Sequence, residues 1–559
     1  MKIHVNQSAY LPYAIKQATV SGSDAAGKTL KLYDSKGRIA AEYTVSETKF
    51  DSNSGEETAL IDFSDINAEG SYHFESDNGI FSFEFDISAA PFAALLEDAI
   101  KMFYYQRCGC DLKPEYAGEY THKACHTAKV KYLYGDGREF HCSGGWHDAG
   151  DYGRYTTAGA VALAHLLYAY KFAPETFDKK NMTLYIPESE NDIPDILNEC
   201  RYELDWLLKM QDRDGAVHHK CTSMRHTDFV MPEDDPLPFI ITPVSSLATA
   251  DFAAVCALAS GLYKDYNRKF SERLADAAKL AGKWLLENPG YLFENPKEVS
   301  TGDYSDPCDL DERFWAHAEL YKLTRDKAYL ELFDKVMKLT GDKDGFIESC
   351  GIKNNLQRYT AGLPTTLIGW EDVGGLASLA IMFSDEGVFD EALKDSLKAL
   401  WLDEADRLKN IADSNNFSLA MKPEDFVWGS NLTVLNNAVI FMTADRLKEN
   451  SGYRDAAIRQ LDYILGSNIL DISYVTGYGS NPFKNPHNRP TFADGIEEPI
   501  PGYVSGGPNY MRLDDAARKN IPEGSPSMKC YTDDVWSYST NEITIYWNSP
   551  LVLLLALLL

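Results

Sequence analysis

Asp148 and Asp151 are the residues whose type and spacing most directly indicate chemistry. They lie three positions apart in the segment 144–153, which reads GGWHDAGDYG; its glycines permit tight turns, and an aromatic residue stands on each side. Two carboxylates held this close cannot both ionise easily unless a water molecule or a metal ion between them offsets the repulsion. The segment therefore predicts a site that grips a water molecule. The competing interpretation is that Asp148 caps a helix and Asp151 meets solvent.

Two later segments add polar and aromatic groups that could bind or protonate a ligand. One spans 537–542, reads SYSTNE and ends at Glu542, and the other spans 474–490 and contains GYGSNP and PHNR. For Glu542 the alternative is a solvated carboxylate near the start of a helix, which the helix dipole favours. For Arg489 the alternative is an ordinary ion pair with one of the many acids of the chain.

The composition is that of a globular, strongly acidic chain. Of its 559 residues 44% are hydrophobic and 12% aromatic, and 84 acids against 54 bases give a formal net charge of -30. Such a field repels phosphate backbones and anionic lipids, so we expect neither a nucleic-acid nor a membrane partner. A neutral ligand is expected instead, because the apolar faces of sugar rings stack on aromatic side chains. The alternative is that the 33 Tyr, 26 Phe and 9 Trp simply fill a large core.

The two ends of the chain and its cysteines bear on location. Residues 1–6 lead directly into strand-like sequence without the apolar stretch of a signal peptide, which predicts a cytoplasmic protein, or a secreted one whose leader has been removed. The leucine-rich stretch 551–559 is too short to span a bilayer and is expected to form a buried final helix. Ten cysteines in a chain of this length do not make a dense disulfide scaffold, so reduced thiols are expected, some of them metal ligands.

Two kinds of periodicity divide the chain near residue 90. Residues 1–88 alternate apolar and polar positions in short runs, which predicts a small antiparallel β-sandwich. From Pro91 onward apolar residues follow the helical period, and Ser549 and Pro550 indicate the N-cap and first position of the final helix. No fixed repeat of an open solenoid is found, so the helices are expected to pair as hairpins closed into a ring. The expected helices span about 91–105, 155–173, 191–211, 245–263, 268–287, 309–324, 327–340, 365–383, 389–411, 430–446, 452–466 and 549–559.

Long stretches between the expected helices hold almost every unusual residue cluster. These stretches are 106–154, 212–244 and 467–548. Long loops in a compact domain are usually functional, and in a helical ring they would gather at one rim and form a groove.

The motif blocks resemble those of the family nine glycoside hydrolases. The blocks WxDAGDYG at 146–153, GxGxNPxxxPHxR at 477–489 and SYxTNE at 537–542 stand in the family's order behind an Ig-like module. The resemblance covers essentially the whole chain, and several blocks in register are far more specific than one. It implies an inverting cellulase or cellodextrinase, mainly α, with an Ig-like β-sandwich at 1–88 and an (α/α)6-barrel catalytic domain of twelve helices at 89–559.

The resemblance also implies a role for each carboxylate. Asp151 is the general base, Asp148 shares and orients the attacking water, and Glu542 is the general acid. Inverting hydrolysis needs the acid and the base about 6.5–9.5 Å apart, which residues so distant in sequence can reach only if the ring closes. From these roles we expect Glu542 in an apolar setting that raises its pKa, and aspartates whose pKa values stay low.

Four other residues are expected to bind sugar. His487 and Arg489 resemble the family's pair that donates hydrogen bonds to the ring just before the cut bond. Asn488 between them departs from the commoner PHHR pattern, which affects only the contact of the second histidine. Trp428 and Tyr538 are candidates for stacking or hydroxyl contacts, and either could equally belong to the core.

A zinc site is expected in the first long loop. Two cysteines and two histidines are the ligand type of closed structural zinc sites, although their spacing is unlike a zinc finger. Some family members with the N-terminal module carry zinc at the matching positions, where it would pin the catalytic loop rather than act as a Lewis acid. Cys110 competes with Cys108 as a ligand, and the alternative is buried thiols with a surface histidine. The expected ligands are Cys108, Cys125, His126 and His147.

A group of acids resembles a calcium site of the family, with a role in stability. Oxygen-rich groups suit a hard cation, but the spacing is not that of an EF-hand and a helix N-terminus also attracts acids. No organic cofactor is expected. The acids are Asp306, Asp309, Asp311, Glu312, Glu371 and Asp372, of which Asp309, Asp311, Glu312 and Glu371 are the chosen ligands.

The leading hypothesis is a glycoside hydrolase that cleaves β-1,4-glucosidic bonds in cellulose, mixed-linkage β-glucan or cello-oligosaccharides. One rival is a metal-dependent hydrolase in which His147, Asp148 and Asp151 hold a catalytic zinc with an open position. A second rival is a non-catalytic oligosaccharide-binding protein. Endo or exo action, preferred chain length and oligomeric state do not follow from the sequence.

Overall fold

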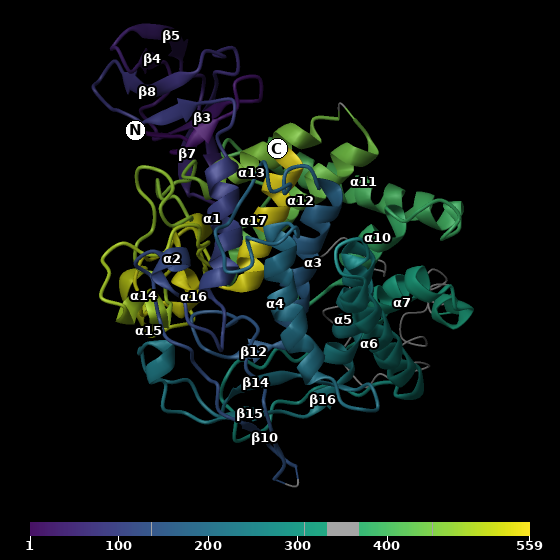
Figure 1. Cartoon of the computed structure of the whole chain (residues 1–559). Coiled ribbons are helices and arrows are strands. Elements are labelled where there is room, and N and C mark those ends of the chain that lie inside the picture. Colours follow the sequence, from purple (N-terminus) through teal and green to yellow (C-terminus); the bar gives the residue numbers. More distant parts are fainter. Residues whose placement is uncertain (136, 307, 332–367, 450) are drawn as a thin grey trace. The chain divides into compact units, whose positions relative to one another are not determined.

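The computed structural model describes residues 1–135, 137–306, 308–331, 368–449 and 451–559 (Figure 1). The chain separates into two compact units. The first unit consists of Met1–Met102 and Leu402–Leu559, and the second consists of Phe103–Trp401.

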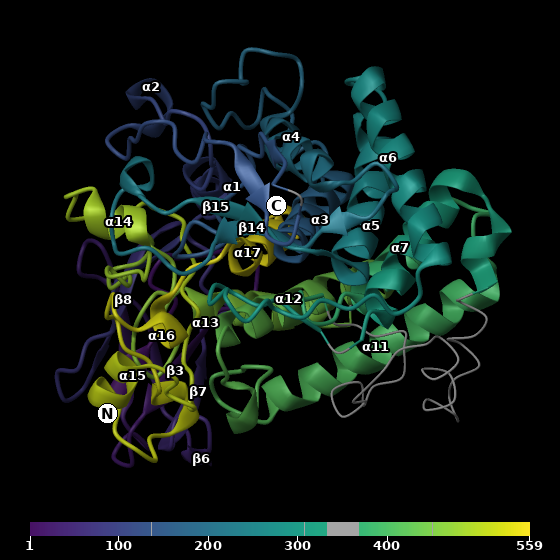
Figure 2. The ribbon, with the colours of Figure 1, turned by 90° about the horizontal axis from the view of Figure 1, so that it is seen from below.

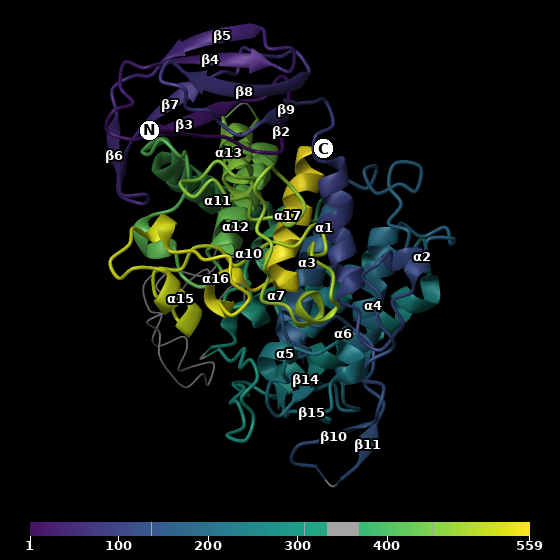
Figure 3. The ribbon, with the colours of Figure 1, turned by 90° about the vertical axis from the view of Figure 1, so that its left-hand side faces the viewer.

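The N-terminal part of the first unit is a β-sandwich. One sheet has the order β1-β3-β7-β6 and the other β2-β9-β8-β4-β5, with antiparallel pairing except between β2 and β9. Figure 3 shows β4, β5 and β8 in one layer and β3 and β7 in the other. The bounds are β1 Lys2–His4, β2 Ala9–Tyr10, β3 Gln17–Ser21, β4 Thr29–Asp34, β5 Ile39–Thr44, β6 Lys49–Asp51, β7 Glu56–Asp62, β8 Gly70–Ser76 and β9 Phe85–Ile87.

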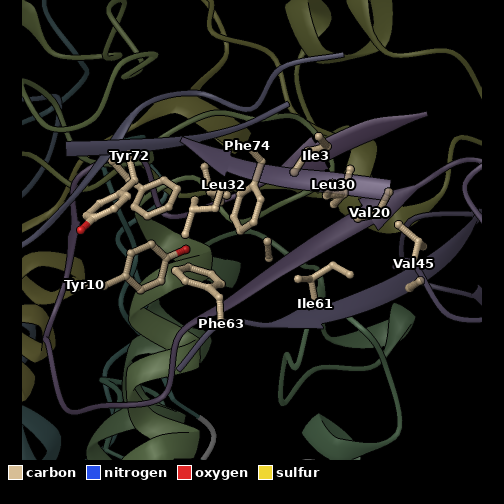
Figure 4. Close-up of a cluster of buried hydrophobic side chains, with 14 of the residues drawn as sticks. Ile3, Tyr10, Val20, Leu30, Leu32, Val45, Ile61, Phe63, Tyr72 and Phe74 are labelled. Atoms are coloured by element: carbon tan, nitrogen blue, oxygen red, sulfur yellow. The ribbon is translucent and has the colours of Figure 1, made fainter. Parts of the chain in front are cut away.

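Alternation along the strands builds the core of this sandwich, as the sequence predicts. In β4, Leu30 and Leu32 are fully buried while their neighbours are partly exposed, because successive side chains point to opposite faces of a strand. Phe63 and Phe74 pack edge to face between the sheets, with ring centroids 5.2 Å apart (Figure 4). The apolar sides of both sheets therefore share one core.

Gln7 ties the sandwich to the C-terminal part of the same unit. Its backbone N–H donates to the carbonyl of Leu465 at 2.9 Å, and its side-chain amide donates to the carbonyl of Asp471 at 2.8 Å. Its side-chain oxygen accepts from the N–H of Asn481 at 2.8 Å. One side chain thus holds both ends of the segment 471–481, which precedes His487.

Two helices of the first unit pack against α12. This helix contacts α13 and α17, and α1 and α11 cross the boundary between the units in sequence. The bounds are α1 Ala93–Tyr105, α11 Glu391–Asp413, α12 Ser430–Leu447, α13 Tyr453–Ile464, α14 Arg489–Ala493, α15 Asp515–Asn520, α16 Tyr538–Asn541 and α17 Ile545–Leu558, with 3-10 turns at Pro423–Asp425 and Ser527–Lys529.

The final helix begins earlier than the sequence predicts. Thr544 is the N-cap of α17, and its hydroxyl accepts from the N–H of Trp547 at 3.0 Å. Pro550 lies inside the helix and supplies no N–H for the carbonyl of Tyr546. The hydroxyl of Ser549 donates to that carbonyl at 3.4 Å. The prediction of Ser549 as the cap is therefore wrong, because the preceding threonine caps and the serine compensates for the proline.

The helices of the second unit pack around α5, which contacts α3, α6 and α7 (Figure 2). Among the described residues α5 alone is long and apolar enough to cross a membrane, but 89% of it is buried inside the structure. A helix that is apolar all round is typical of a core position. The bounds are α2 Pro114–Ala117, α3 Thr156–Phe172, α4 Asp195–Met210, α5 Ser246–Tyr263, α6 Arg268–Glu287, α7 Leu310–Thr324 and α10 Gly374–Met382, with 3-10 turns at Pro232–Asp234 and Lys327–Tyr329.

Two predicted helices of this unit differ from the structure. Of the one expected at 365–383, residues 365–367 lie outside the described residues. From residue 368 onward it is helical only over α10, because residues 369–372 form a turn and the N–H of Val373 donates to Asp311 at 2.8 Å. The one expected at 327–340 starts as a 3-10 turn, and 332–340 lie outside the described residues.

Short strands join the long loops of the second unit, where the sequence predicted almost none. They form one sheet of order β11-β10-β15-β14-β12 and a pair β13-β16. Strands of two to four residues are too short to show a period of two in sequence. The bounds are β10 Val130–Tyr132, β11 Glu139–Phe140, β12 Arg154–Tyr155, β13 Val217–His218, β14 Lys220–Ser223, β15 Phe239–Ile241 and β16 Val244–Ser245.

Candidate active site

The loop 143–153, which carries both aspartates, is fixed by its backbone. The N–H of His147 donates to the carbonyl of Gln106 at 2.7 Å, and the side-chain amide of Gln106 donates back to two carbonyls of the loop at 3.0 Å each. Helix α3 begins only at Thr156. Asp148 is therefore not the cap of this helix, and the capping interpretation is wrong.

Asp148 is buried, and its environment differs from the one expected. The hydroxyl of Tyr304 donates to its Oδ2, and its Oδ1 has no hydrogen-bond partner among the described residues. Burial raises the pKa of Asp148 well above its ordinary value; the hydrogen bond from Tyr304 lowers it in part, and the charge of Asp151 raises it. The expectation of a low pKa for this aspartate is wrong, because desolvation outweighs the single hydrogen bond.

Asp151 is only 9% exposed, and three groups converge on its Oδ2. The N–H of Gly153 donates to it at 3.0 Å and the hydroxyl of Tyr155 at 3.5 Å. The Nδ1 atom of His226 lies 3.5 Å from the same oxygen. These contacts fix the orientation of the Asp151 carboxyl group.

Tyr304 is a site residue that the sequence analysis missed. Its backbone lies in the left-handed region at φ 49, a conformation that a bulky residue adopts only when its surroundings enforce it. The buried ammonium of Lys220 donates to the carbonyl of Gly302 at 2.6 Å, and the Tyr304 ring packs 4.9 Å from Trp370. In the sequence, Tyr304 is marked only by its position just before the acid group at 306–312.

Buried charges support the same loop. The guanidinium of Arg154 donates to the carbonyls of Cys142 and Gly144 at 2.5 and 2.7 Å. The carboxyl of Glu203 accepts from the N–H of Trp146 at 2.6 Å, and burial raises the pKa of Glu203 to about 8. The start of the loop is thus held by groups that have no access to solvent.

The structure brings the four expected zinc ligands together. One ligand atom from each of these residues lies within 4.8 Å of all the others. The Sγ of Cys108 is 3.8 Å from Nδ1 of His126, and Nε2 of His147 is 3.4 Å from that same nitrogen. The opposite ring nitrogen of His126 pairs with Asp235 at 3.2 Å, the kind of contact that orients a metal-binding histidine. Cys108 rather than Cys110 belongs to this cluster, whose fourth member is Cys125.

Most acids of the expected calcium group are buried. Asp311 and Glu312 have pKa values raised well above the ordinary range by burial and by neighbouring acids. Asp372 lies close enough to raise the pKa of Asp311, whereas Glu371 is exposed. Asp309 pairs with Arg313 at 2.9 Å.

Asp251 is an addition that the sequence analysis missed. It lies on the core helix α5 and is fully buried, and neither of its oxygens has a hydrogen-bond partner among the described residues. Burial, followed by the charge of Asp306, raises its pKa well above the ordinary value. An apolar helix with one buried acid offers little sequence signal for a site.

Glu542 lies in the first unit, where it directly follows α16 and is half-buried. It forms a parallel bridge with His487, whose N–H donates to the carbonyl of Asn541 at 2.9 Å. On the other side the N–H of Gly506 donates to the carbonyl of Glu542 at 2.9 Å. Glu542 is therefore positioned by backbone pairing with two neighbouring segments, and it does not start a helix.

The other expected sugar-binding residues of this unit lie near His487. The Nδ1 atom of His487 binds the carbonyl of Val535 at 2.6 Å, and its ring centroid is 6.1 Å from that of Tyr538. Tyr538 in turn packs 5.4 Å from Trp428, which is 46% exposed and so does not belong to the core. The pKa of Tyr538 is raised by burial and then by nearby acids, Glu542 among them.

Asn488 has a structural task that explains the departure from PHHR. Its side-chain oxygen caps α14 by accepting from the N–H of Thr491 at 3.1 Å and from the hydroxyl of the same residue at 2.9 Å. Arg489 is the first residue of that helix and is 5% exposed. The asparagine therefore orients the turn that carries Arg489.

Comparison with known proteins identifies the family. A model described as glycosyl hydrolase family 9 matches residues 92–555, and one described as a cellulase N-terminal Ig-like domain matches residues 1–79. The chain belongs to glycosyl hydrolase family 9. The resemblance found in the motif blocks is confirmed, and the chain is a glycoside hydrolase with an Ig-like sandwich in front of its family 9 domain.

Three relatives match this family 9 hydrolase along nearly their whole length. It is 42% identical to a cellodextrinase of Butyrivibrio fibrisolvens, with 99% of both chains covered. The solved structure of AaCel9A in complex with cellobiose-like isofagomine is 32% identical and superposes with a TM-score of 0.89 over 100% of this chain and 99% of the other. A Zn-binding triple mutant of the family 9 endoglucanase J30 is 30% identical, with a TM-score of 0.87 over 98% and 99% of the two chains.

Proposed function

We propose that this family 9 hydrolase cleaves β-1,4-glucosidic bonds of cello-oligosaccharides and related β-glucans with inversion at the anomeric carbon. The observation that carries the proposal is the pair Asp148 and Asp151 on one rigid loop, in two different environments. The similarity to a cellodextrinase and to a protein crystallised with a cellobiose-like ligand supports the substrate class.

The proposed mechanism assigns one proton transfer to each side of the bond. Asp151 removes a proton from water as the water oxygen attacks the anomeric carbon, and Glu542 gives its proton to the leaving oxygen. Asp148, which is held by Tyr304, forms a hydrogen bond with the same water and orients it. Inversion requires the two reacting carboxyl groups about 6.5–9.5 Å apart, with room for the water.

The sugar next to the cut bond is proposed to bind His487 and Arg489. The Nδ1 atom of His487 faces a backbone carbonyl, so that the imidazole is held in one orientation. Arg489 is set by the cap of α14. Trp428, exposed and in ring contact with Tyr538, is proposed to stack on a sugar face.

We further propose that the helices from α1 to α17 close into an (α/α)6 barrel of twelve helices. The antiparallel packing partners α5 with α6 and α12 with α13 follow each other directly in sequence, as helix hairpins do. The TM-scores with family 9 structures support this architecture. In such a barrel the long loops that carry the site residues would lie at one end.

Zinc is proposed at Cys108, Cys125, His126 and His147. Two thiols and two imidazoles suit a tetrahedral structural site, and a bound zinc ion would crosslink the loop that starts at residue 106 to the start of the aspartate segment. His147 is one of four protein donors, and a site closed by four ligands keeps no open position for substrate. This arrangement disfavours the rival in which a catalytic zinc is held by His147 and the two aspartates.

Calcium is proposed at the buried acid group. Buried carboxylates that raise one another's pKa suit a hard cation, and a bound calcium ion would offset the repulsion that acts on Asp311 and Glu312. Asp306 and Asp372 lie near these two acids, whereas Asp309 is committed to Arg313. The proposed role is to hold the start of α7 and the turn before α10.

The test of this function is the anomeric form of the first product and one substitution. NMR of cellohexaose hydrolysis is expected to show the α-anomer first; the β-anomer would mean retention and a different pair of carboxylates. Asp151→Asn is expected to lower kcat by several orders of magnitude while the affinity for cellohexaose is kept. An unchanged rate would remove Asp151 from the mechanism, and a wild-type chain that binds without cleaving would favour the sugar-binding rival.

A further inference from the structure

Two large aromatic side chains of the first unit stand at the surface in contact with each other. Trp536 is 57% exposed and Phe492 is 47% exposed. Their ring centroids are 5.6 Å apart, and the ring planes make an angle of 62°. Exposed aromatic rings that gather in one place are typical of binding sites, because each ring offers an apolar face to a ligand at a small cost in conformational entropy.

The backbone ties both rings to the proposed sugar-binding residues. Trp536 directly follows Val535, whose carbonyl binds Nδ1 of His487 at 2.6 Å. Phe492 lies on α14, which begins at Arg489, and its N–H donates to the carbonyl of Asn488 at 3.1 Å. Each ring is therefore within a few residues of a group that is proposed to hold the sugar next to the cut bond.

The segment that carries Trp536 is rigid. Asp534 accepts from the N–H of Trp536 at 3.0 Å through its side chain, and its carbonyl accepts from the N–H of Ser537 at 2.9 Å. The second side-chain oxygen of Asp534 accepts from the amide of Asn520 at 2.9 Å. The backbone of this turn is thus fixed before a ligand binds, which limits the conformational entropy lost on binding.

The size and charge of this patch favour a sugar over a protein. A stable protein interface buries about 1,200–2,000 Å², far more than two side chains offer, whereas a single pyranose ring matches one indole face. The chain carries a formal net charge of -30, which suits a neutral ligand. Phe492 also lies on the same short helix as Arg489, and Trp536 follows the residue whose carbonyl binds His487.

We propose that Trp536 and Phe492 form a second stacking platform, which binds a glucosyl residue of the substrate chain beyond the residue held by His487 and Arg489. This inference rests on the proposed function, and it makes this face of the first unit a determinant of chain-length preference. A chain too short to reach the platform gains nothing from it, while a longer chain gains one stacked ring.

The experiment compares cello-oligosaccharides from cellobiose to cellohexaose as substrates and ligands of the full chain. For Trp536→Ala we expect kcat/KM and affinity to fall about tenfold for the longest oligosaccharides and to stay within about twofold for the shortest that is cleaved. Phe492→Ala is expected to show the same dependence on length with a smaller loss. Trp536→Tyr keeps an aromatic face and is expected to recover most of the affinity.

Phe50→Ala is the matched control, because Phe50 is 67% exposed on β6 of the sandwich. It is expected to change none of these values, and thermal unfolding verifies that all variants fold. An equal loss at every length, or no loss at any, would overturn the proposal. So would a wild-type dimer that Trp536→Ala converts to a monomer, since the platform would then be a contact between copies. If the wild-type chain neither binds nor cleaves cellohexaose, the proposed function itself fails.

Discussion

The loop that carries Asp148 and Asp151 and the segment that carries Glu542 are held in two different ways. The loop is buried: Arg154 and Glu203 bind its backbone, and a cluster of cysteines and histidines adjoins it. The Glu542 segment is held by backbone pairing with His487 and Gly506, Glu542 itself is half-buried, and Tyr538 of the same segment packs against the exposed Trp428. The two carboxylate groups therefore belong to different physical environments.

This difference matches the two proposed tasks. A general base must hold one small water molecule in a fixed direction, and misplacement by about 1 Å can lower a rate about a hundredfold. A general acid meets a leaving sugar that arrives with each new chain, so that a surface of aromatic and polar groups suits it better. A buried loop suits the proposed base, and a half-buried carboxyl group in a segment that packs against an exposed tryptophan suits the proposed acid.

The largest expected effect separates the acid from the base. Glu542→Gln is expected to lower kcat on cellohexaose by about 10²–10⁴-fold, because the leaving sugar then departs without a proton. A cellobioside with a dinitrophenolate leaving group needs no proton and is expected to be cleaved by this variant at nearly the wild-type rate. Asp151→Asn is expected to be slow on both substrates. Steady-state rates on the two substrates measure the difference, and equal losses in Glu542→Gln would contradict its role as the acid.

The next effect concerns the proposed zinc site beside the aspartate loop. Cys108→Ser is expected to lose bound zinc and to lower Tm by roughly 5–10 °C, because a ligand of a structural site is removed. Cys110→Ser is the matched control, since Cys110 lies outside the cluster. Hydrogen exchange should quicken in 143–153 of the first variant but not in 537–542. Equal zinc content in both variants, measured by elemental analysis, would refute the assignment of Cys108.

A smaller effect is expected at the residue that holds Asp148. Tyr304→Phe removes the hydroxyl that donates to Asp148 and is expected to lower kcat about 10–100-fold with little change in KM. Tyr134→Phe serves as the control, because its hydroxyl binds Glu298 at the surface. A change in KM alone would mean that Tyr304 binds sugar rather than positioning the aspartate.

The smallest effect is a pH dependence of stability from Glu203. Burial raises the pKa of Glu203 from 4.5 to about 8, so the folded state keeps its proton where the unfolded state has lost it. This contribution to stability is fully present below pH 4.5 and is lost as the pH rises to about 8. Glu203→Gln is expected to flatten the fall of Tm over this range, whereas Glu272→Gln on the exposed face of α6 should leave it unchanged. A wild-type slope in Glu203→Gln would mean that another group titrates.

The candidate site residues that the sequence pointed to are those that stand in short, recognisable segments. The aspartate pair, His487 with Arg489 at the start of α14, and Glu542 each stand in a block whose spacing is recognisable. The two cysteines and two histidines were also found, although they come from three separate segments. Most helices were predicted within a few residues, because the apolar period of a core-facing helix is strong.

What the sequence could not predict depends on contacts between distant segments. Tyr304 reaches Asp148 from a far part of the chain, and Asp251 joins the acid group from a helix that reads as pure core. The expectation of a low pKa for Asp148 followed from its role by resemblance. The burial that raises this pKa is set by packing, which neighbours in sequence do not show. The start of α17 was misplaced since Thr544 and Ser549 are both good caps, and only the folded chain shows which one is used.

The contacts of Gln7 predict that the N-terminal sandwich cannot be deleted without disturbing the rest of its unit. Truncation before residue 89 would strip hydrogen-bond partners from the carbonyls of Leu465 and Asp471 and from the N–H of Asn481. Those groups bracket the polypeptide that leads to His487, so their loss is expected to disturb the residues that are proposed to bind sugar. In protein engineering, a variant in which the sandwich is replaced or deleted would therefore also need new hydrogen-bond partners for Leu465, Asp471 and Asn481.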